Sequence, residues 1–192
     1  MGEELQELPL GELWHRVADG GRGMGAGAVA AATAATAASL VEMVSRASVD
    51  MWPEAAAVAG QAHALRAWAT QLAQVNMETY GSAKEALEAA YSGGGETASL
   101  QESLGEAMEV PLRIAELAGE VAELAARTAQ SGDYDLRPDA AAATALAAAS
   151  ARAAAHLVSI NLTATDEDPR TSAARAAAED AEAQSRVALG EE

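Results

Sequence analysis

The sequence contains no cysteine, which excludes disulfides, thiolate nucleophiles and cysteine-ligated zinc. It also lacks phenylalanine and has only three tryptophans, three tyrosines and five prolines among 192 residues. The apolar half of the composition is mostly alanine, and alanine has the highest helix propensity. The composition therefore predicts an all-α protein whose short side chains require the helices to pack closely.

Positive charge is scarce as well. Lys and Arg number 12 and Asp and Glu number 29, which gives a formal net charge of −17. Nucleic acids and anionic membranes bind clustered cations, so we expect neither as a partner. The chain begins acidic, without the basic and apolar parts of a signal peptide, and its longest uncharged run, Gly23 to Val41, is only weakly hydrophobic. We therefore expect a cytoplasmic protein with no membrane span.

Helical periodicity and helix-breaking residues divide the chain into five or six helices. The first helix has one apolar face, made of Leu10, Leu13, Trp14 and Val17. An alanine-rich helix is predicted over about 25–47, a third from near 53, and a fourth over about 97–130, where Pro111 should kink or break it. Two more begin near 138 and 169. We expect one domain over residues 1–192, a bundle of antiparallel, closely packed helices.

A glycine-rich stretch, GGRGMGAG at residues 20–27, precedes the alanine-rich helix. It is not a Walker loop, because no Gly-Lys-Ser/Thr follows, and no strand precedes it as a dinucleotide-binding fold requires. Two interpretations remain open. Glycines such as Gly25 and Gly27 either let two helices touch backbone to backbone, or leave N–H groups bare at a helix N-terminus that binds a carboxylate or phosphate. Arg22 would then add positive charge.

The histidines are too far apart in sequence to predict a metal site. His63 shares a predicted helix with Arg66, and it is either a general base or an ordinary packed or solvated side chain.

Three polar residues near the two ends of the fifth helix are also candidates. Asp135 and Asp139 lie in the turn GDYDLRPD, where they either cap the turn and the helix or bind a ligand. Asn161, among apolar residues, either caps its own helix or presents a donor and an acceptor to a heterocycle.

Five segments, taken in order, resemble the cyclodeaminase/methenyltetrahydrofolate cyclohydrolase family, the C-terminal domain type of formimidoyltransferase-cyclodeaminase. They are RGMGAGAVAA at 22–31, NMETY at 76–80, AMEVPL at 107–112, GDYDLRPD at 132–139 and LVSINL at 157–162. The resemblance covers nearly the whole chain. It implies an all-helical fold, a tetrahydrofolate derivative bound without a metal, and a homodimer with its sites near the subunit interface.

The resemblance also assigns roles to particular residues. The family's proposed catalytic aspartate falls at Asn76, and an amide cannot accept a proton as a carboxylate can. Glu78 lies on a different helix face from Asn76, which weakens it as a replacement. The catalytic candidates are Asn76, Glu78, His63 and Asp139. The substrate-binding candidates are Arg22, Gly25, Gly27, Tyr80, Asp135, Asp139 and Asn161.

The resemblance implies two reactions for family members: ring closure of 5-formiminotetrahydrofolate with loss of ammonia, and hydrolysis of the methenyl form. We expect this chain to be a divergent enzyme of that type. Two alternatives follow from the altered motifs. In the first, the scaffold is recruited to a non-folate cyclisation or condensation in a specialised pathway. In the second, the protein is a non-catalytic binding or assembly protein.

Overall fold

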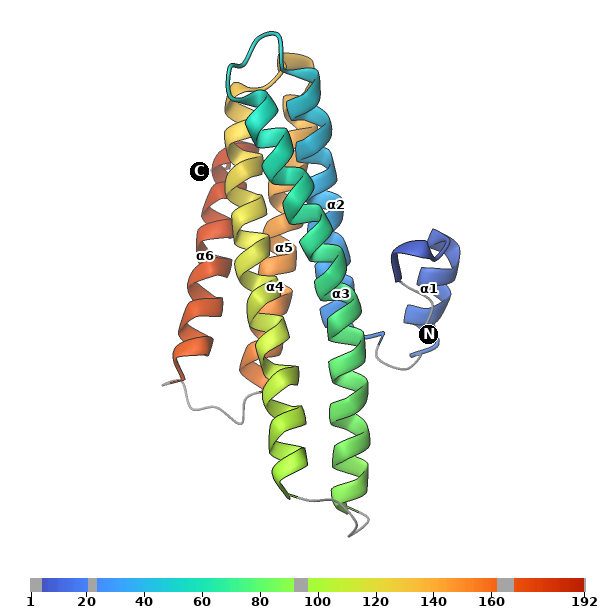
Figure 1. Cartoon of the computed structure of the whole chain (residues 1–192). Coiled ribbons are helices and arrows are strands. Elements are labelled where there is room, and N and C mark those ends of the chain that lie inside the picture. Colours follow the sequence, from blue (N-terminus) through green and yellow to red (C-terminus); the bar gives the residue numbers. More distant parts are fainter. Residues whose placement is uncertain (1–4, 21–23, 92–96, 162–167, 192) are drawn as a thin grey trace.

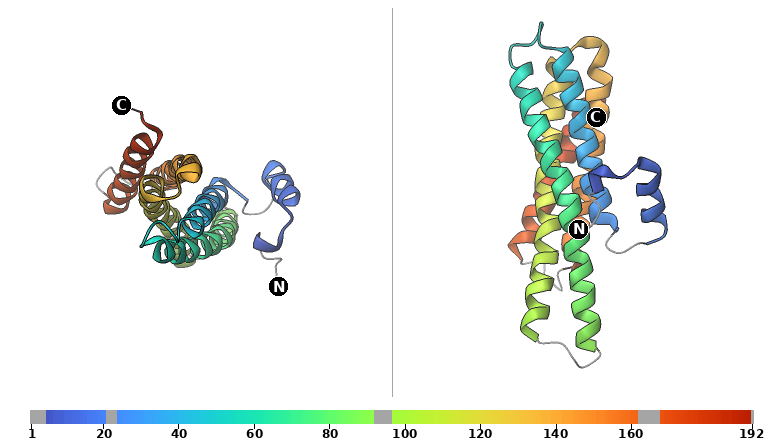
Figure 2. Two further views of the ribbon diagram at one scale, coloured as in Figure 1. Left: turned by 90° about the horizontal axis from the view of Figure 1, so that it is seen from above. Right: turned by 45° about the vertical axis from the view of Figure 1, so that its right-hand side comes forward.

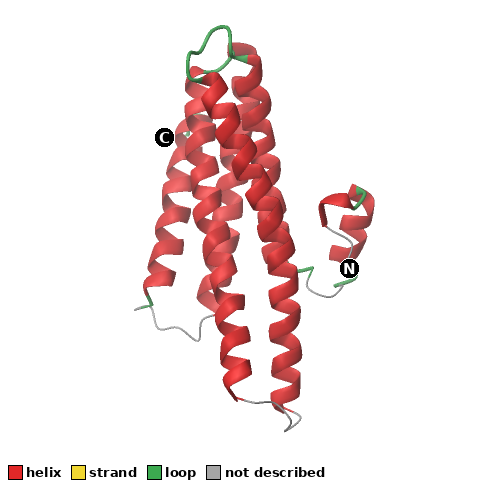
Figure 3. Cartoon of the chain, in the orientation of Figure 1, coloured by secondary structure: helices red, strands yellow, loops and turns green. Residues whose placement is uncertain are grey.

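The computed structural model describes residues 5–20, 24–91, 97–161 and 168–191, and it leaves the side chains of residues 97–104, 106–108 and 161 undescribed. The described residues form α-helices and two short 3-10 helices, without a strand (Figure 1, Figure 3). The elements are η1 (Leu5–Glu7), α1 (Leu10–Ala18), α2 (Ala26–Ala47), α3 (Ala55–Tyr91), α4 (Thr97–Ser131), η2 (Tyr134–Leu136), α5 (Arg137–Asn161) and α6 (Pro169–Leu189). The predicted all-α bundle is confirmed.

Helices α2 to α6 run alternately up and down and form one elongated bundle (Figure 1). α2 packs against α3, α4 and α5, while α6 packs against α4 and α5 on the far side of the bundle. α3 and α4 are the longest helices and extend together beyond the others at the lower end of Figure 1. α1 lies to one side of the helices α2 to α6 in both views of Figure 2, and its Leu13 and Val17 pack against the hydrophobic core. The chain therefore has a compact bundle and an N-terminal arm that packs beside it.

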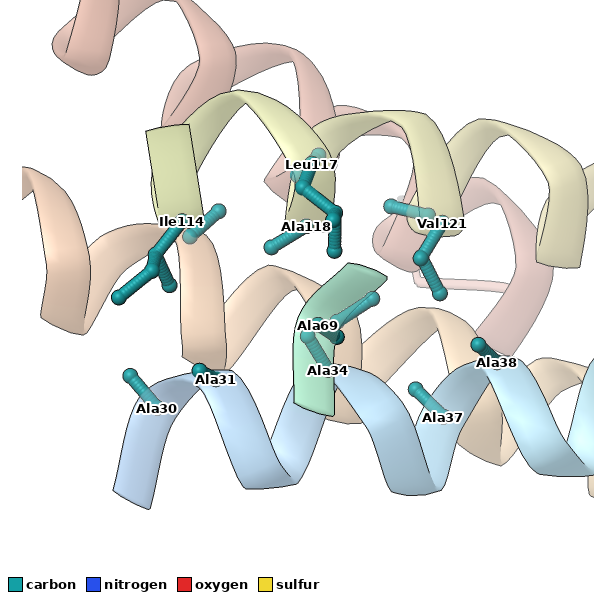
Figure 4. Close-up of a cluster of buried hydrophobic side chains, with 14 of the residues drawn as sticks. Ala30, Ala31, Ala34, Ala37, Ala38, Ala69, Ile114, Leu117, Ala118 and Val121 are labelled. Carbon is teal, nitrogen blue, oxygen red and sulfur yellow. The ribbon is translucent and has the colours of Figure 1, made fainter. Parts of the chain in front are cut away.

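The core of the bundle is lined largely by alanine. Ala30, Ala34 and Ala37 of α2 face Ile114 and Leu117 of α4, with other alanines filling the space between (Figure 4). Because an alanine side chain is one methyl group, helices that meet through alanine approach closely enough to fill the space between them. The close packing predicted from composition is therefore seen at these contacts.

Helix boundaries agree with the predictions to within about two residues, as is usual for such boundaries. Gly25 is the N-cap of α2. Asp168 caps α6, its carboxylate accepting a hydrogen bond from the Arg170 N–H at 2.8 Å. Of the two outcomes predicted at Pro111, a kink or a break, the break is wrong, because α4 continues through this fully buried proline. Burial against neighbouring helices compensates the lost backbone hydrogen bond.

Two stretches, Ala26–Ala47 and Tyr134–Ile160, are long and apolar enough to cross a bilayer by length and composition alone. The core helix of a soluble protein passes the same test, and both stretches pack within the bundle. Only 56% and 44% of their apolar windows are buried, however.

Candidate functional site at the start of α2

The start of α2 has no side-chain cap. Gly25 is extended at the N-cap and makes no capping side-chain bond, while its carbonyl accepts the N–H of Val29 at 3.2 Å. The N–H groups of the first turn of a helix have no partner within the helix itself. They give this end of α2 the partial positive charge that a carboxylate or phosphate would approach. Arg22, expected to assist, lies outside the described residues.

Gly27 leaves room for the side chain of Asn76 from α3. A Cβ atom at Gly27 would lie 2.3 Å from Oδ1 of Asn76 and 2.7 Å from both Cγ and Nδ2. Such distances are far below van der Waals contact, so no other residue fits without moving the amide. The contact differs from the first sequence interpretation, because Gly27 accommodates a polar side chain rather than a second backbone.

Asn76 is 7% exposed. An amide held in one place beside a helix start offers a donor and an acceptor in fixed directions, which can recognise the edge of a heterocycle. An amide does not gain or lose a proton at ordinary pH, so Asn76 cannot serve as a general acid or base. The geometry thus brings together two of the predicted residues, Gly27 and Asn76.

Glu78 and Tyr80 lie on the same stretch of α3 but differ in setting. Glu78 accepts a hydrogen bond from Gln74 Nε2 at 2.6 Å, and Gln74 Oε1 in turn accepts the backbone N–H of Leu5 at 3.1 Å. Glu78 therefore belongs to the contact that holds the N-terminal segment against α3. Tyr80 is exposed, one turn along the helix from Asn76.

A cavity of about 210 Å³ lies between α1 and the outer side of α2. Its walls are mostly apolar and include Leu10, Trp14, Met24, Val29 and Thr33. Met24 and Ala28 place one end of this cavity near the start of α2, but neither Gly27 nor Asn76 lines it. α1 forms the outer wall of the cavity.

His63 lies elsewhere on α3. Thirteen residues separate it from Asn76, about 20 Å along a helix. Its Nδ1 lies 3.3 Å from Oε1 of Glu42 and 2.9 Å from the guanidinium of Arg66. His63 therefore does not share a site with Asn76 within one chain.

Sequence reasoning missed Glu42, a nearly buried carboxylate. It contacts Arg46 and lies 3.1 Å from Nε of Arg66, besides its contact with His63. Burial alone would raise the pKa of Glu42, but the charges of Arg46 and Arg66 and the hydrogen bonds from His63 and Arg66 lower it overall. The i, i+4 spacing of Glu42 and Arg46 was the available sequence signal.

The turn that contains Asp135 lies at the other end of α2. The Asp133 N–H donates to Ser48 Oγ at 2.8 Å, and a Cβ at Gly132 would lie 3.3 Å from the same oxygen. Ser48 follows Gly27 by 21 residues, which is about 30 Å along a helix. Asp135 is exposed and Asp139 is half-buried in the first turn of α5. These two aspartates are therefore remote from Asn76 in the same chain.

Asn161 is the last residue of α5, and its side chain is outside the described set. Ser150 of α5 donates to the Ala30 carbonyl of α2 at 2.7 Å, which places the second half of α5 beside the start of α2. The helix thus ends at the same end of the bundle as Gly27. Among described residues, no group of three His, Asp or Glu side chains could hold a metal ion.

Comparison with known proteins supplies the family. The sequence profile of the formiminotransferase-cyclodeaminase family matches residues 9–180. A crystal structure of formiminotetrahydrofolate cyclodeaminase from Thermotoga maritima is similar, with a TM-score of 0.80, 25% sequence identity, and coverage of 97% of this chain and 94% of that one. No curated protein sequence matches. With a profile match over most of its length and a similar fold from end to end, this chain belongs to the formiminotransferase-cyclodeaminase family.

Proposed function

We propose that this protein is a divergent cyclodeaminase- or cyclohydrolase-type enzyme that acts on a one-carbon adduct of tetrahydrofolate. Its substrate is the formimino form, closed to a ring with loss of ammonia, or the methenyl form, opened by water. The observation that carries the proposal is the buried Asn76 amide in the space left by Gly27, at the uncapped start of α2. Family membership and the similarity to a formiminotetrahydrofolate cyclodeaminase support the same class of reaction.

In this proposal the start of α2 and Asn76 bind and orient the substrate. The uncapped helix start attracts an anionic group such as a folate carboxylate, and Asn76 pairs with the edge of the ring. Both reactions pass through a tetrahedral carbon between nitrogens and need proton transfers near neutral pH. Asn76 cannot supply them, so another acid–base group must.

The remaining predicted residues support a site shared by two chains. His63, Asp135 and Asp139 lie about 20 to 30 Å from the Asn76 contact along the helices of one chain. No proton transfer spans such a distance directly. We therefore propose a homodimer in which a second chain brings the turn containing Asp135 and Asp139 toward Asn76, with Asp139 or Glu78 as the acid–base group.

Thermal melting with reduced folates tests ligand binding. Tetrahydrofolate, its 5-formyl derivative and its methenyl derivative are added separately at millimolar concentration. A ligand at about a hundred times its Kd stabilises the folded state by about 2.7 kcal/mol, which raises Tm by several degrees. Unchanged melting with all three folates rejects the folate proposal.

The Asn76→Asp variant tests the chemistry. If position 76 is the place of the family's catalytic carboxylate, the variant hydrolyses the methenyl form faster than the native chain, as followed by absorbance. A melting shift in the native protein without turnover in either chain favours a non-catalytic binding protein. The specific observation behind that alternative is the amide at position 76.

A further inference from the structure

A cleft of about 280 Å³ lies between α5 and α6, which are antiparallel neighbours in the bundle (Figure 1). On α5 it is lined at helical spacings of four and three by Arg152, His156 and Ser159. On α6 its walls include Thr171 and Glu182. Its volume is close to the lower limit of about 300 Å³ for ligand pockets, so a small metabolite is the occupant that fits it. We name it the α5–α6 cleft.

The cleft is on the side of α5 away from the site at the start of α2. Ser150 of α5 donates to the Ala30 carbonyl of α2, which marks the side of α5 that faces α2. Arg152, His156 and Ser159 follow Ser150 by two, six and nine residues. At about 100° per residue, these positions lie on the opposite side of the helix. A ligand in the cleft is therefore distinct from the substrate of the proposed function.

The hydroxyl of Thr171, at one end of the cleft, is unpaired. Thr171 is 7% exposed, and its Oγ1 is buried without a hydrogen-bond partner among the described residues. Thr33, Thr70 and Thr128 each donate to the carbonyl four residues earlier. Thr171 is the third residue of α6, so its own helix supplies no such carbonyl. Because buried polar atoms are nearly always hydrogen-bonded, this hydroxyl is a candidate contact for a ligand in the cleft.

The other end of the cleft holds an ion pair that is not closed. Nη1 of Arg152 lies 3.6 Å from Oε2 of Glu182, which is too far for a hydrogen bond. Both side chains are also open to solvent, at 64% and 47% exposed. A guanidinium binds a carboxylate and a carboxylate binds an ammonium group. Together the two side chains match the head group of an α-amino acid.

The other charges of the cleft also favour a ligand that carries both signs. Arg175 and Glu179 line it between its two ends. A simple cation would meet two arginines there, and a simple anion would meet two glutamates. The net charge of −17 adds a long-range repulsion for an anion, which a zwitterion does not experience.

The length of the cleft selects among amino acids. Glu182 follows Thr171 by eleven residues, which is about 16 Å along α6. Side chains on a helix lean toward its N-terminus, so the Glu182 carboxylate lies nearer to Thr171 than its backbone does. An amino acid bound by its head group at Glu182 therefore needs a long side chain to reach the Thr171 hydroxyl.

We propose that the α5–α6 cleft binds a free α-amino acid with a long polar side chain. Its carboxylate binds Arg152, its ammonium group binds Glu182, and the end of its side chain pairs with the hydroxyl of Thr171. Ser159 Oγ donates to the His156 carbonyl at 2.7 Å, which leaves its lone pairs to accept from the ligand. Such a ligand joins α5 to α6, so its binding stabilises the bundle.

Thermal melting with free amino acids tests the binding. The standard L-amino acids are added one at a time, and a ligand at about a hundred times its Kd raises Tm by several degrees. A long polar amino acid should raise Tm, whereas alanine, which offers the head group alone, should not. Acetylating the ligand's amino group, or converting its α-carboxylate to an amide, should remove the shift. An unchanged Tm with every amino acid would overturn the proposal.

Variants of the cleft locate the site by isothermal titration calorimetry. Arg152→Gln should raise the Kd of the amino acid at least about tenfold, as expected for loss of a hydrogen bond between charged groups. Arg186→Gln, at an exposed arginine outside the cleft, should not change the Kd.

Thr171→Val removes the unpaired hydroxyl and keeps the shape of the side chain. It should weaken binding without lowering the Tm of the ligand-free chain, because no hydrogen bond is lost there. Thr128→Val, at a buried threonine of α4, should leave the Kd unchanged. Native affinity in both Arg152→Gln and Thr171→Val would show that the amino acid binds elsewhere. None of these measurements uses a folate, so their failure is distinct from failure of the proposed reaction.

Discussion

At the scale of single residues, Gly27 is the position on which the candidate site depends. Replacing it by alanine puts a methyl group 2.3 Å from Asn76 Oδ1, so the amide or the helix must move. We expect Gly27→Ala to cost about 1 to 3 kcal/mol in stability, as overpacking does, and to abolish the melting shift with reduced folate.

Gly60→Ala is the matched control for that change. Gly60 also lies within a helix, but no atom lies within 4 Å of its added Cβ. Alanine there should be neutral or should stabilise by up to about 1 kcal/mol, with ligand binding unchanged. Equal losses of binding in both variants would mean that Gly27 matters only for folding.

Glu42 gives a second prediction at this scale, on pH. The pKa of Glu42 is lowered in the folded state, because Arg46, Arg66 and His63 outweigh the effect of burial. The ionised carboxylate therefore stabilises the fold fully at any pH above its pKa in the unfolded chain, which is about 4.3. The contribution is lost as the pH falls through the lower folded pKa. Glu42→Gln should therefore reduce the free energy of unfolding by about 1 to 2 kcal/mol at pH 7. Below about pH 4.5, the free energy of unfolding of the variant should fall less steeply with pH than that of the native protein, as measured by denaturant titrations.

At the scale of elements, the join between α2 and the η2 turn rests on one buried hydroxyl. Ser48 Oγ donates to the Val44 carbonyl at 2.7 Å and accepts the Asp133 N–H at 2.8 Å. Ser48→Ala should cost about 1 to 3 kcal/mol, because the Asp133 N–H loses its partner. Ser39→Ala, at an exposed serine that bonds only its own helix, should change the unfolding midpoint little.

The elements themselves were largely predictable from sequence. Local signals set the start of α2 at Gly25 and the cap of α6 at Asp168. The 3.6-residue period predicted α1, yet it could not show that this helix lies to one side of the helices α2 to α6, because periodicity reports an apolar face and not what covers it. Pro111 was misjudged because burial outweighed a local preference.

The site was less predictable than the helices. Gly27 and Asn76 were both candidates, but their contact joins residues 49 positions apart, which one sequence without relatives does not reveal. The separation of Asp139 from Asn76 follows from the direction of α5, which is likewise a tertiary property. Glu42 was missed because a glutamate beside arginine reads as an ordinary surface pair.

At the scale of the whole molecule, the proposed dimer makes stability depend on concentration. Raising the protein concentration a hundredfold should raise Tm by several degrees, since association favours the folded state. Calorimetry over a concentration series checks this, and a concentration-independent native Tm would contradict the dimer.

The alanine core has a consequence for how this sequence can change over generations. Ala34, Ala37, Ala69 and Ala118 are fully or almost fully buried where helices meet. Glycine there loosens the helix and any larger residue forces it outward, so each position tolerates little besides alanine and serine. In a saturation-mutagenesis library, these sites should be nearly invariant among surviving clones, and most accepted variation should fall on the charged outer surfaces.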